Sequence, residues 1–144
     1  MTDILKKTEA FVRKWNGRFC DFDGYAGSQC VDAARTAFAE IHGCKKQPPG
    51  VIGAADFAGA DFSGTGLRFL KCAERDVLIG DVVVYGKTEK NGYGHIAVCV
   101  GKLPACHLVL EQNGFTDKDG DGKADGVCYL DWRSLNVLGV IRAA

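Results

Sequence analysis

The sequence predicts an α+β domain in which two N-terminal helices pack on an antiparallel β-sheet. Both helical patterns lie within residues 3–43, and five short apolar runs bounded by glycine or polar residues follow residue 77. Helices that precede a group of strands favour this class over alternating βαβ units. The 144 residues suit one domain, and no repeat, linker or low-complexity segment divides them. We therefore expect residues 1–144 to form a single domain.

The first helix is expected at residues 3–16, where Asp3 can cap the start and Ile4, Phe11 and Trp15 share one face. A turn-like segment, residues 17–29, follows it. The second helix is expected to begin at Cys30 and to end at Gly43. Its buried stripe is expected to contain Ala33, Ala34, Ala37, Phe38 and Ile41.

The remainder of the chain changes character near residue 77. Residues 45–70 are rich in Gly, Pro, Ala and Asp, and only the short "AADFA" is expected to form a helical turn. The strands are expected in "DVVVYG", "GHIAVCVG", "CHLVLEQN", "GVCYLDW" and "VLGVIRA".

Composition excludes several classes of protein. Lys plus Arg and Asp plus Glu both number 18, and the resulting zero net charge argues against nucleic-acid binding, which needs a basic excess or patch. The first 15 residues lack the apolar core of a signal peptide and no run reaches membrane-spanning length, so neither export nor membrane insertion is expected. The seven cysteines form no CxxC pair, which argues against a zinc site. We interpret them as free thiols of a reducing cytosol, with Cys99 and Cys106 acting as small hydrophobic residues in apolar runs.

Cys30 stands out because it follows the acidic, turn-rich "DFDGYAGSQ" and opens the second predicted helix. The free N–H groups and the macrodipole at a helix N-terminus favour a thiolate, which is the nucleophilic form. A cysteine nucleophile usually also needs a histidine base held by a third polar group.

Three histidines compete for the role of base. His95 begins the run "GHIAVCVG", and the glycine beside it leaves room for a substrate. Glu111 and Asn113 share one face of the next predicted strand, about 7 Å apart, and are candidates for the third group. His107 lies on that same face and is an alternative base. His42 ends the second helix, where a cation would suit the dipole.

The ordered motifs "DFDGYAGSQCVD", "IGDVVVYG…GHIAVCVG", "LEQN" and "VLGVIRA" resemble the CHAP family over residues 5–142. These are cysteine- and histidine-dependent amidohydrolases/peptidases, common in bacteriophage endolysins. The resemblance implies a papain-like fold in which the helices pack on the antiparallel sheet. It implies the following roles: Cys30 as nucleophile, His95 as general base, Glu111 as the acid that orients the histidine, and Asn113 as a further polar member. Gln29 or the backbone N–H of Cys30 would bind the oxyanion.

This resemblance implies a peptidoglycan hydrolase that cleaves either the N-acetylmuramoyl-L-alanine amide or a peptide bond of the wall. Such an enzyme would stay in the host cytoplasm until it is released to the wall. Because no separate wall-binding domain is visible, targeting would use the catalytic cleft, a partner subunit or an additional segment. Two alternatives are a related γ-glutamyl cell-wall cysteine peptidase and a non-catalytic calcium-binding wall or adhesion module.

Two acidic loops suggest calcium. Side chains of Asp21 and Asp23 and the carbonyl of Tyr25 alternate as ligands of a hard cation do, and Asp32 follows Cys30. Gly27 could add only its carbonyl. Some CHAP endolysins resemble this stretch and bind calcium there, although the acids could equally be solvated turn residues and helix caps.

The second acidic loop, "DKDGDGKADG" at residues 117–126, has EF-hand-like spacing with Gly122 at the sharp turn. Cys128 stands where the bidentate glutamate of an EF-hand belongs, so a metal-binding hairpin loop or a plain acidic turn is expected instead, with Asp131 as an outside candidate. The ligand candidates are Asp117, Asp119, Asp121, Asp125 and the carbonyl of Lys123.

Overall fold

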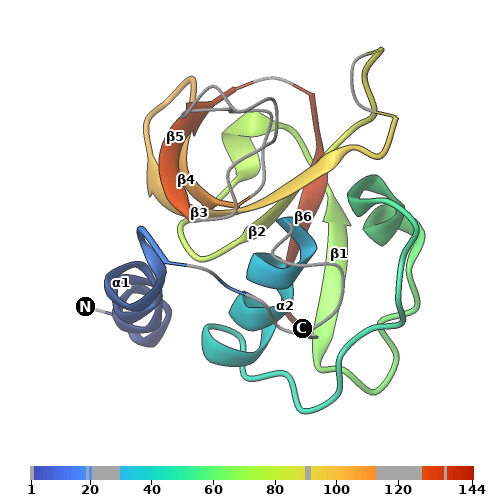
Figure 1. Cartoon of the computed structure of the whole chain (residues 1–144), viewed down its shortest axis with the longest axis horizontal. Helices are drawn as coiled ribbons and strands as arrows, with labels where there is room; N and C mark the ends of the chain where they lie inside the picture. The colour runs from blue at the N-terminus through green and yellow to red at the C-terminus, as the bar shows by residue number, and fades with distance from the viewer. Residues whose placement is uncertain (1, 19, 21–29, 90–91, 113–127, 135) are drawn as a thin grey trace.

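A six-stranded antiparallel sheet with two helices on one side makes up the fold (Figure 1). The computed structural model describes residues 2–18, 20, 30–89, 92–112, 128–134 and 136–144. The strand order is β1-β6-β2-β3-β4-β5. The elements along the chain are α1 (Asp3–Trp15), α2 (Cys30–Glu40), the 3-10 helix η1 (Ala54–Gly59), β1 (Leu67–Lys71), the 3-10 helix η2 (Glu74–Asp76), β2 (Val82–Tyr85), β3 (His95–Lys102), β4 (His107–Glu111), β5 (Tyr129–Arg133) and β6 (Val137–Ala143).

Helix α1 forms as its pattern predicts, but its N-cap is Thr2 and not Asp3. The Thr2 hydroxyl accepts a hydrogen bond from the Leu5 N–H at 3.3 Å, and Asp3 instead forms an ion pair with Lys7 in the first turn. Thr2 precedes the helix in an extended conformation, which is the geometry that lets its oxygen reach back to an unpaired N–H. Phe11 is buried, while Ile4 and Trp15 pack against the edge of the core.

Helix α2 lies in front of the centre of the sheet and packs mainly on β3 (Figure 1). The predicted stripe is buried throughout: Ala33, Ala34, Ala37, Phe38 and Ile41. Its three alanines are small, so the helix axis can approach the sheet closely. The chain leaves the helix through Gly43, whose positive φ of 65° suits glycine at a C-terminal stop.

The two faces of the sheet bury two separate apolar clusters. Alternate residues of the strands face α1 and α2 in one cluster, which includes Val84, Ile96 and Leu110. Their neighbours in sequence, such as Val83, Ala97 and Val109, face the other way and pack with Val77 and Tyr85. This alternation explains why the central strands read as continuous apolar runs.

Five of the six strands lie in the predicted runs, and the antiparallel arrangement is confirmed. The sequence predicts no strand within residues 45–70. This prediction is wrong for the end of that segment, because β1 begins at Leu67. Its sequence "LRFLK" is too short and mixed to be recognised, but it pairs with β6, and Phe69 lies directly over Gly139. An added Cβ at Gly139 would meet the Phe69 ring at 2.5 Å, so the edge pairing depends on that glycine.

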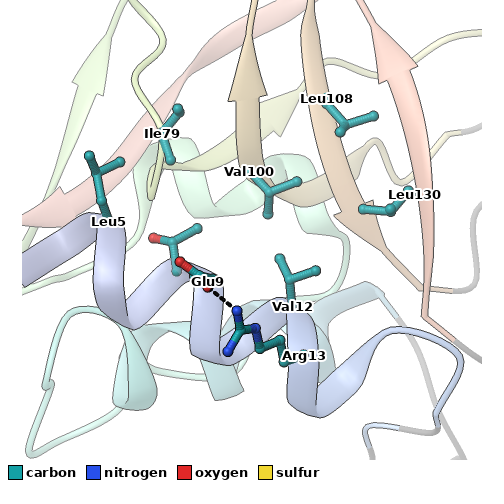
Figure 2. Close-up of a pocket in the computed structure, with 9 residues that line it drawn as sticks. Leu5, Glu9, Val12, Arg13, Ile79, Val100, Leu108 and Leu130 are labelled. Atoms are coloured by element: carbon teal, nitrogen blue, oxygen red, sulfur yellow. Dashed lines mark ion pairs between the residues drawn. The ribbon is translucent and has the colours of Figure 1, made fainter. Parts of the chain in front are cut away.

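A groove of about 470 Å³ separates α1 from the strands β3, β4 and β5 (Figure 2). Apolar side chains line it on both sides, including Leu5 and Val12 from α1 and Leu108 and Leu130 from the sheet. Glu9 and Arg13 form an ion pair at its rim. Within the described residues, none of the helices combines the length and the apolar character needed to span a membrane.

Candidate active site

Cys30 is the first residue of α2 and lies against the start of β3. The backbone N–H groups of Ile96, Val31 and Cys30 itself lie near enough to the sulfur to lower its pKa, and Ile96 directly follows His95. Burial raises the pKa of Cys30 to about 11, more than these N–H groups lower it, and the nearby Glu111 adds to the rise. The N–H groups at the helix N-terminus thus favour a thiolate, as expected, but desolvation outweighs them and keeps the pKa of the Cys30 thiol raised.

His95 is the first residue of β3 and is 5 % exposed. Its Nε2 lies 3.3 Å from Glu111 Oε1 on the neighbouring strand β4. A carboxylate only accepts hydrogen bonds, so Nε2 carries the proton that it donates to Glu111. In the neutral ring Nδ1 is then the nitrogen with a free electron pair, which is the form that a base requires.

Glu111 is fully buried at the end of β4 and is held as a carboxylate by Arg133 of β5. Arg133 donates from Nε to Oε1 at 2.5 Å and from Nη2 to Oε2 at 2.7 Å. Burial alone would raise the pKa of Glu111, but Arg133 and His95 outweigh it and lower the pKa to about 2. The structure thus places His95, Glu111 and Arg133 in direct contact, with Cys30 close to Ile96 and within electrostatic reach of Glu111.

Arg133 was not predicted from the sequence. Strand pairing places it beside His107 on β4, four residues along β5 from the partner of Glu111, and its long side chain reaches back to the carboxylate. Only the register of β4 against β5 reveals this proximity. A basic residue at the end of a short strand carries no such signal by itself.

The competing histidines have other partners. His107 bonds through Nε2 to the Tyr85 hydroxyl and through Nδ1 to Glu74, each at 2.6 Å, so it does not contact Glu111 as a rival base would. His42 lies at the end of α2, as expected, but it is not a cation facing the helix dipole. Its Nε2 bonds to the Gly80 carbonyl at 2.7 Å, its Nδ1 accepts from the Ala143 N–H at 3.2 Å, and burial lowers its pKa.

Gly94, beside His95, has a packing role that differs from the expected space for a substrate. Its φ of +75° lies in the left-handed region, and an added Cβ would come within 2.5 Å of the Ala55 Cβ. The glycine therefore lets η1 close over the connection between β2 and β3.

Gln112 links the site to the segment that contains Cys20, and it was not selected as a site residue from the sequence. It is fully buried, donates to the Cys20 carbonyl at 2.6 Å and accepts from the Cys20 N–H at 2.8 Å. The Cys128 thiol donates to the same amide oxygen at 3.1 Å. Because Gln112 follows Glu111, it ties the chain near residue 20 to the end of β4.

Several predicted site residues lie outside the described residues: Gln29, Asn113, Asp21, Asp23, Tyr25, Gly27, Asp117, Asp119, Asp121, Lys123 and Asp125. Asp32 is described, and it is a buried residue in the first turn of α2. Among the residues that the structure covers, no three His, Cys, Asp or Glu side chains are grouped as metal ligands. All seven cysteines are free thiols, as the absence of CxxC pairs suggested.

The α+β architecture matches that of known endolysins. The crystal structure of wild-type endolysin LysIME-EF1 superposes with a TM-score of 0.73 at 20% identity, over 96% of this chain and 63% of that one. Ly7917 gives 0.69 at 16% identity, over 96% of this chain and 62% of its own. PlyC gives 0.65 at 16% identity, over 97% of this chain and 36% of its own. At these identities the likeness establishes the fold.

Sequence similarity leads to the same group of proteins. Endolysin PlyTW of Staphylococcus phage Twort is 32% identical over 113 residues, which are 76% of this chain and 24% of PlyTW. No family model matches the sequence. The chain, which spans about a quarter of the length of this relative, is therefore an endolysin homologue, consistent with the resemblance to CHAP-type phage endolysins.

Proposed function

We propose that this chain is the bond-cleaving part of a peptidoglycan hydrolase, with Cys30 as nucleophile, His95 as base and Glu111 as the acid that orients the base. The observation that carries the proposal is the position of the Cys30 sulfur near the N–H of Ile96, the residue that follows His95. The Nε2 of His95 is bonded to the buried carboxylate of Glu111. The relation to PlyTW supports the cell wall as the place of action. A structure of Ly7917 with "the hydrolyzing product of MDP" supports wall material as substrate for this fold.

Proton transfer is the first step, because so little thiolate exists beforehand. With a pKa of about 11, only about one Cys30 in ten thousand is ionised at pH 7. His95 Nδ1 takes the thiol proton as the sulfur attacks the carbonyl carbon of an amide. The resulting imidazolium donates through Nε2 to Glu111, whose negative charge stabilises it.

The second half of the reaction releases an amine and then an acid. The new S–C bond gives a tetrahedral oxyanion, which the N–H groups at the start of α2 can stabilise. The C–N bond breaks as His95 returns the proton to the leaving amine, and a thioester remains on Cys30. Water, deprotonated by His95, attacks this thioester, and the S–C bond breaks to restore the thiol. Gln29 and Asn113 are proposed to assist as oxyanion donor and polar partner, respectively.

The test compares cysteine variants in a turbidity assay on purified bacterial walls. Cys30→Ala and Cys30→Ser are expected to lose at least about a thousandfold in rate because no thiolate can form. Cys106→Ala is the matched control, since its thiol is half-buried at the opposite end of β3 and β4. Unchanged thermal melting of all three variants shows that they fold. Wall lysis by Cys30→Ala would remove the nucleophile assignment.

The bond that is cut distinguishes the candidate activities. Mass spectrometry of the digested walls separates an amidase, which leaves free lactyl groups, from an endopeptidase, which leaves new peptide termini. Cleavage after a γ-glutamyl residue would favour the γ-glutamyl peptidase alternative. The proposal also includes a stage in the host cytoplasm before release to the wall, and targeting by a partner subunit or an additional segment.

We also propose that Ca²⁺ supports the segment before Cys30, with Asp21, Asp23, Tyr25, Gly27 and Asp32 as ligands. Asp32 fits this role because it is an acidic residue held in the first turn of α2, two positions after the nucleophile. The ion would order this segment and supply local positive charge. Calcium is expected to raise the melting temperature of the wild type but not of Asp32→Asn. A second step in the titration, absent from Asp119→Asn, would assign the residue 117–125 loop as well.

A further inference from the structure

Tyr85 of β2 lies between two imidazole rings on the face of the sheet opposite α2. Its ring centroid is 5.7 Å from that of His95, with the planes 24° apart, and 5.9 Å from that of His107, with the planes 7° apart. The guanidinium carbon of Arg133 lies 5.2 Å from the Tyr85 centroid. We propose that Tyr85 is a positioning residue that fixes the plane of the His95 imidazole, and that His107 and Glu74 hold Tyr85 in place. This inference rests on the proposed role of His95 as base.

A directed chain of hydrogen bonds holds the Tyr85 ring. The His107 Nδ1–H donates to Glu74 Oε1 at 2.6 Å, which leaves Nε2 to accept from the Tyr85 hydroxyl at 2.6 Å. Glu74 is fixed in turn by Lys102, whose Nζ donates to Oε2 at 2.7 Å. Burial raises the pKa of Tyr85 above its ordinary value, so the phenol keeps the proton that it donates.

His95 needs such a support because its bond to Glu111 leaves one rotation free. A single hydrogen bond of 3.3 Å fixes the direction of Nε2, but the ring can still turn about that direction and move Nδ1 away from the sulfur. A stacked aromatic ring restricts this turn, because rotation would lift the imidazole off the phenol face. Arg133 contacts Glu111 and lies over Tyr85, so it joins the two supports.

The polar composition of this cluster is not needed for packing. Tyr85 and His107 belong to the same buried face as Val83, Val109 and Cys99, where apolar side chains would fill the space without polar atoms to satisfy. The titratable groups bonded to the two imidazoles are Glu74 of η2, Tyr85 of β2 and Glu111 of β4, and the cations Lys102 and Arg133 are bonded to the two carboxylates.

The kinetic test uses a graded pair of substitutions at position 85. Tyr85→Phe keeps the ring on His95 and loses only the bond to His107, so we expect kcat to fall about two- to fivefold. Tyr85→Leu removes the stacked ring, and we expect kcat to fall tenfold or more with KM within twofold of the wild type. Val83→Ala is the matched control: it removes buried volume from the same strand and face without touching the chain of hydrogen bonds. It is expected to lower the melting temperature and leave kcat unchanged.

A spectroscopic measurement separates this inference from the proposed function. ¹⁵N NMR of histidine-labelled protein reports the tautomer of each ring without any substrate. The wild type is expected to show His95 with its proton on Nε2, and Tyr85→Leu is expected to show a mixture of tautomers or a broadened His95 signal. His42, which is bonded to Gly80 and Ala143, serves as an internal reference.

The two measurements test the proposed function and the positioning role of Tyr85 separately. Wall lysis that survives Cys30→Ala would overturn the proposed function, yet the His95 spectrum of Tyr85→Leu would still decide the positioning role. That role is overturned if the spectrum and the kcat of folded Tyr85→Leu match those of the wild type. It is also overturned if only KM rises, because that result would make Tyr85 a substrate contact, or if Val83→Ala lowers kcat as far as Tyr85→Leu.

Discussion

Two histidines begin adjacent strands of the sheet and each is bonded to a carboxylate, yet only His95 directly precedes a residue whose N–H lies near the Cys30 sulfur. His95 opens β3 and is bonded to Glu111, which Arg133 neutralises. His107 opens β4 and is bonded to Glu74, which Lys102 neutralises. A buried histidine, carboxylate and cation are therefore not enough to define a catalytic base.

The difference lies in the second nitrogen of each ring. His95 binds its carboxylate through Nε2, and the N–H of the next residue, Ile96, lies near enough to the Cys30 sulfur to lower its pKa. His107 binds its carboxylate through Nδ1, and its Nε2 is occupied by a tyrosine hydroxyl. The first arrangement leaves a nitrogen for chemistry, whereas the second uses both nitrogens to hold Tyr85.

The two histidines are distinguished most clearly by removing each imidazole in turn. His95→Ala is expected to lower wall-lytic kcat by about a thousandfold, because it removes the base that is proposed to take the thiol proton. His107→Asn is expected to cost tenfold or less, since it only loosens Tyr85. Turbidity assays with melting temperatures measured in parallel decide the point. If His107→Asn proved as inactive as His95→Ala while still folded, the two histidines would have to share the chemistry.

The dependence of the unfolding free energy on pH in acid tests the charge of the Glu111 carboxylate. The pKa of Glu111 is lowered to about 2 in the folded state from 4.5, so the stability it contributes is present above about pH 4.5 and is lost as the pH falls toward 2. The difference between the two pKa values corresponds to about 3 kcal/mol of unfolding free energy. Urea unfolding between pH 6 and pH 2 is expected to show this loss in the wild type and a flatter profile in Glu111→Gln.

Glu74→Gln is the control for this profile, because it removes the carboxylate of the other histidine and leaves Glu111 bonded to Arg133. The steep acid dependence is therefore expected to remain in that variant. A wild-type profile that Glu111→Gln leaves unaltered would show that the buried carboxylate is not the group that titrates.

The sequence was informative where a single element decides the outcome and uninformative where two elements must meet. The stripe from Ala33 to Ile41 follows from helical spacing alone, and the five strands after residue 77 follow from apolar runs. Motif order was enough to select Cys30, His95 and Glu111. Arg133, Tyr85 and Gln112 gave no such signal, because each acts across strands whose register only the folded sheet sets.

Burial opposes the effect that the sequence predicts for the pKa of Cys30. Its place at a helix N-terminus is visible in the sequence and favours a thiolate. The desolvation that raises its pKa to about 11 depends on α2 packing against β3, which no local pattern records. The desolvation that comes from this packing thus outweighs the effect of the helix N-terminus on the pKa of Cys30.

Removing the cation bonded to each carboxylate is expected to have a smaller effect. Arg133→Met leaves the fully buried Glu111 without its two charged hydrogen bonds, and we expect a loss of about 2–4 kcal/mol of unfolding free energy. Lys102→Met disrupts a pair whose side chains are 20% and 17% exposed, so a loss of about 1 kcal/mol or less is expected. Urea unfolding at pH 7 measures both. Equal losses would mean that water shields the two carboxylates alike.

The third histidine supplies the smallest effect and a reference for the other two. Burial lowers the pKa of His42, so the folded state binds fewer protons than the unfolded state once the pH falls below the ordinary histidine value near 6.5. The unfolding free energy therefore decreases as the pH falls through that value. Its slope against pH stays below the slope for one full proton, and it levels off below the lowered pKa of His42. His42→Gln is expected to flatten the unfolding free energy between pH 7 and pH 5 and to leave wall-lytic kcat unchanged, because its partners are Gly80 and Ala143 rather than the site. A fall in kcat would mean that a change at the C-terminal end of α2 alters the position of Cys30 at its N-terminal end. His42 would then also contribute to catalysis.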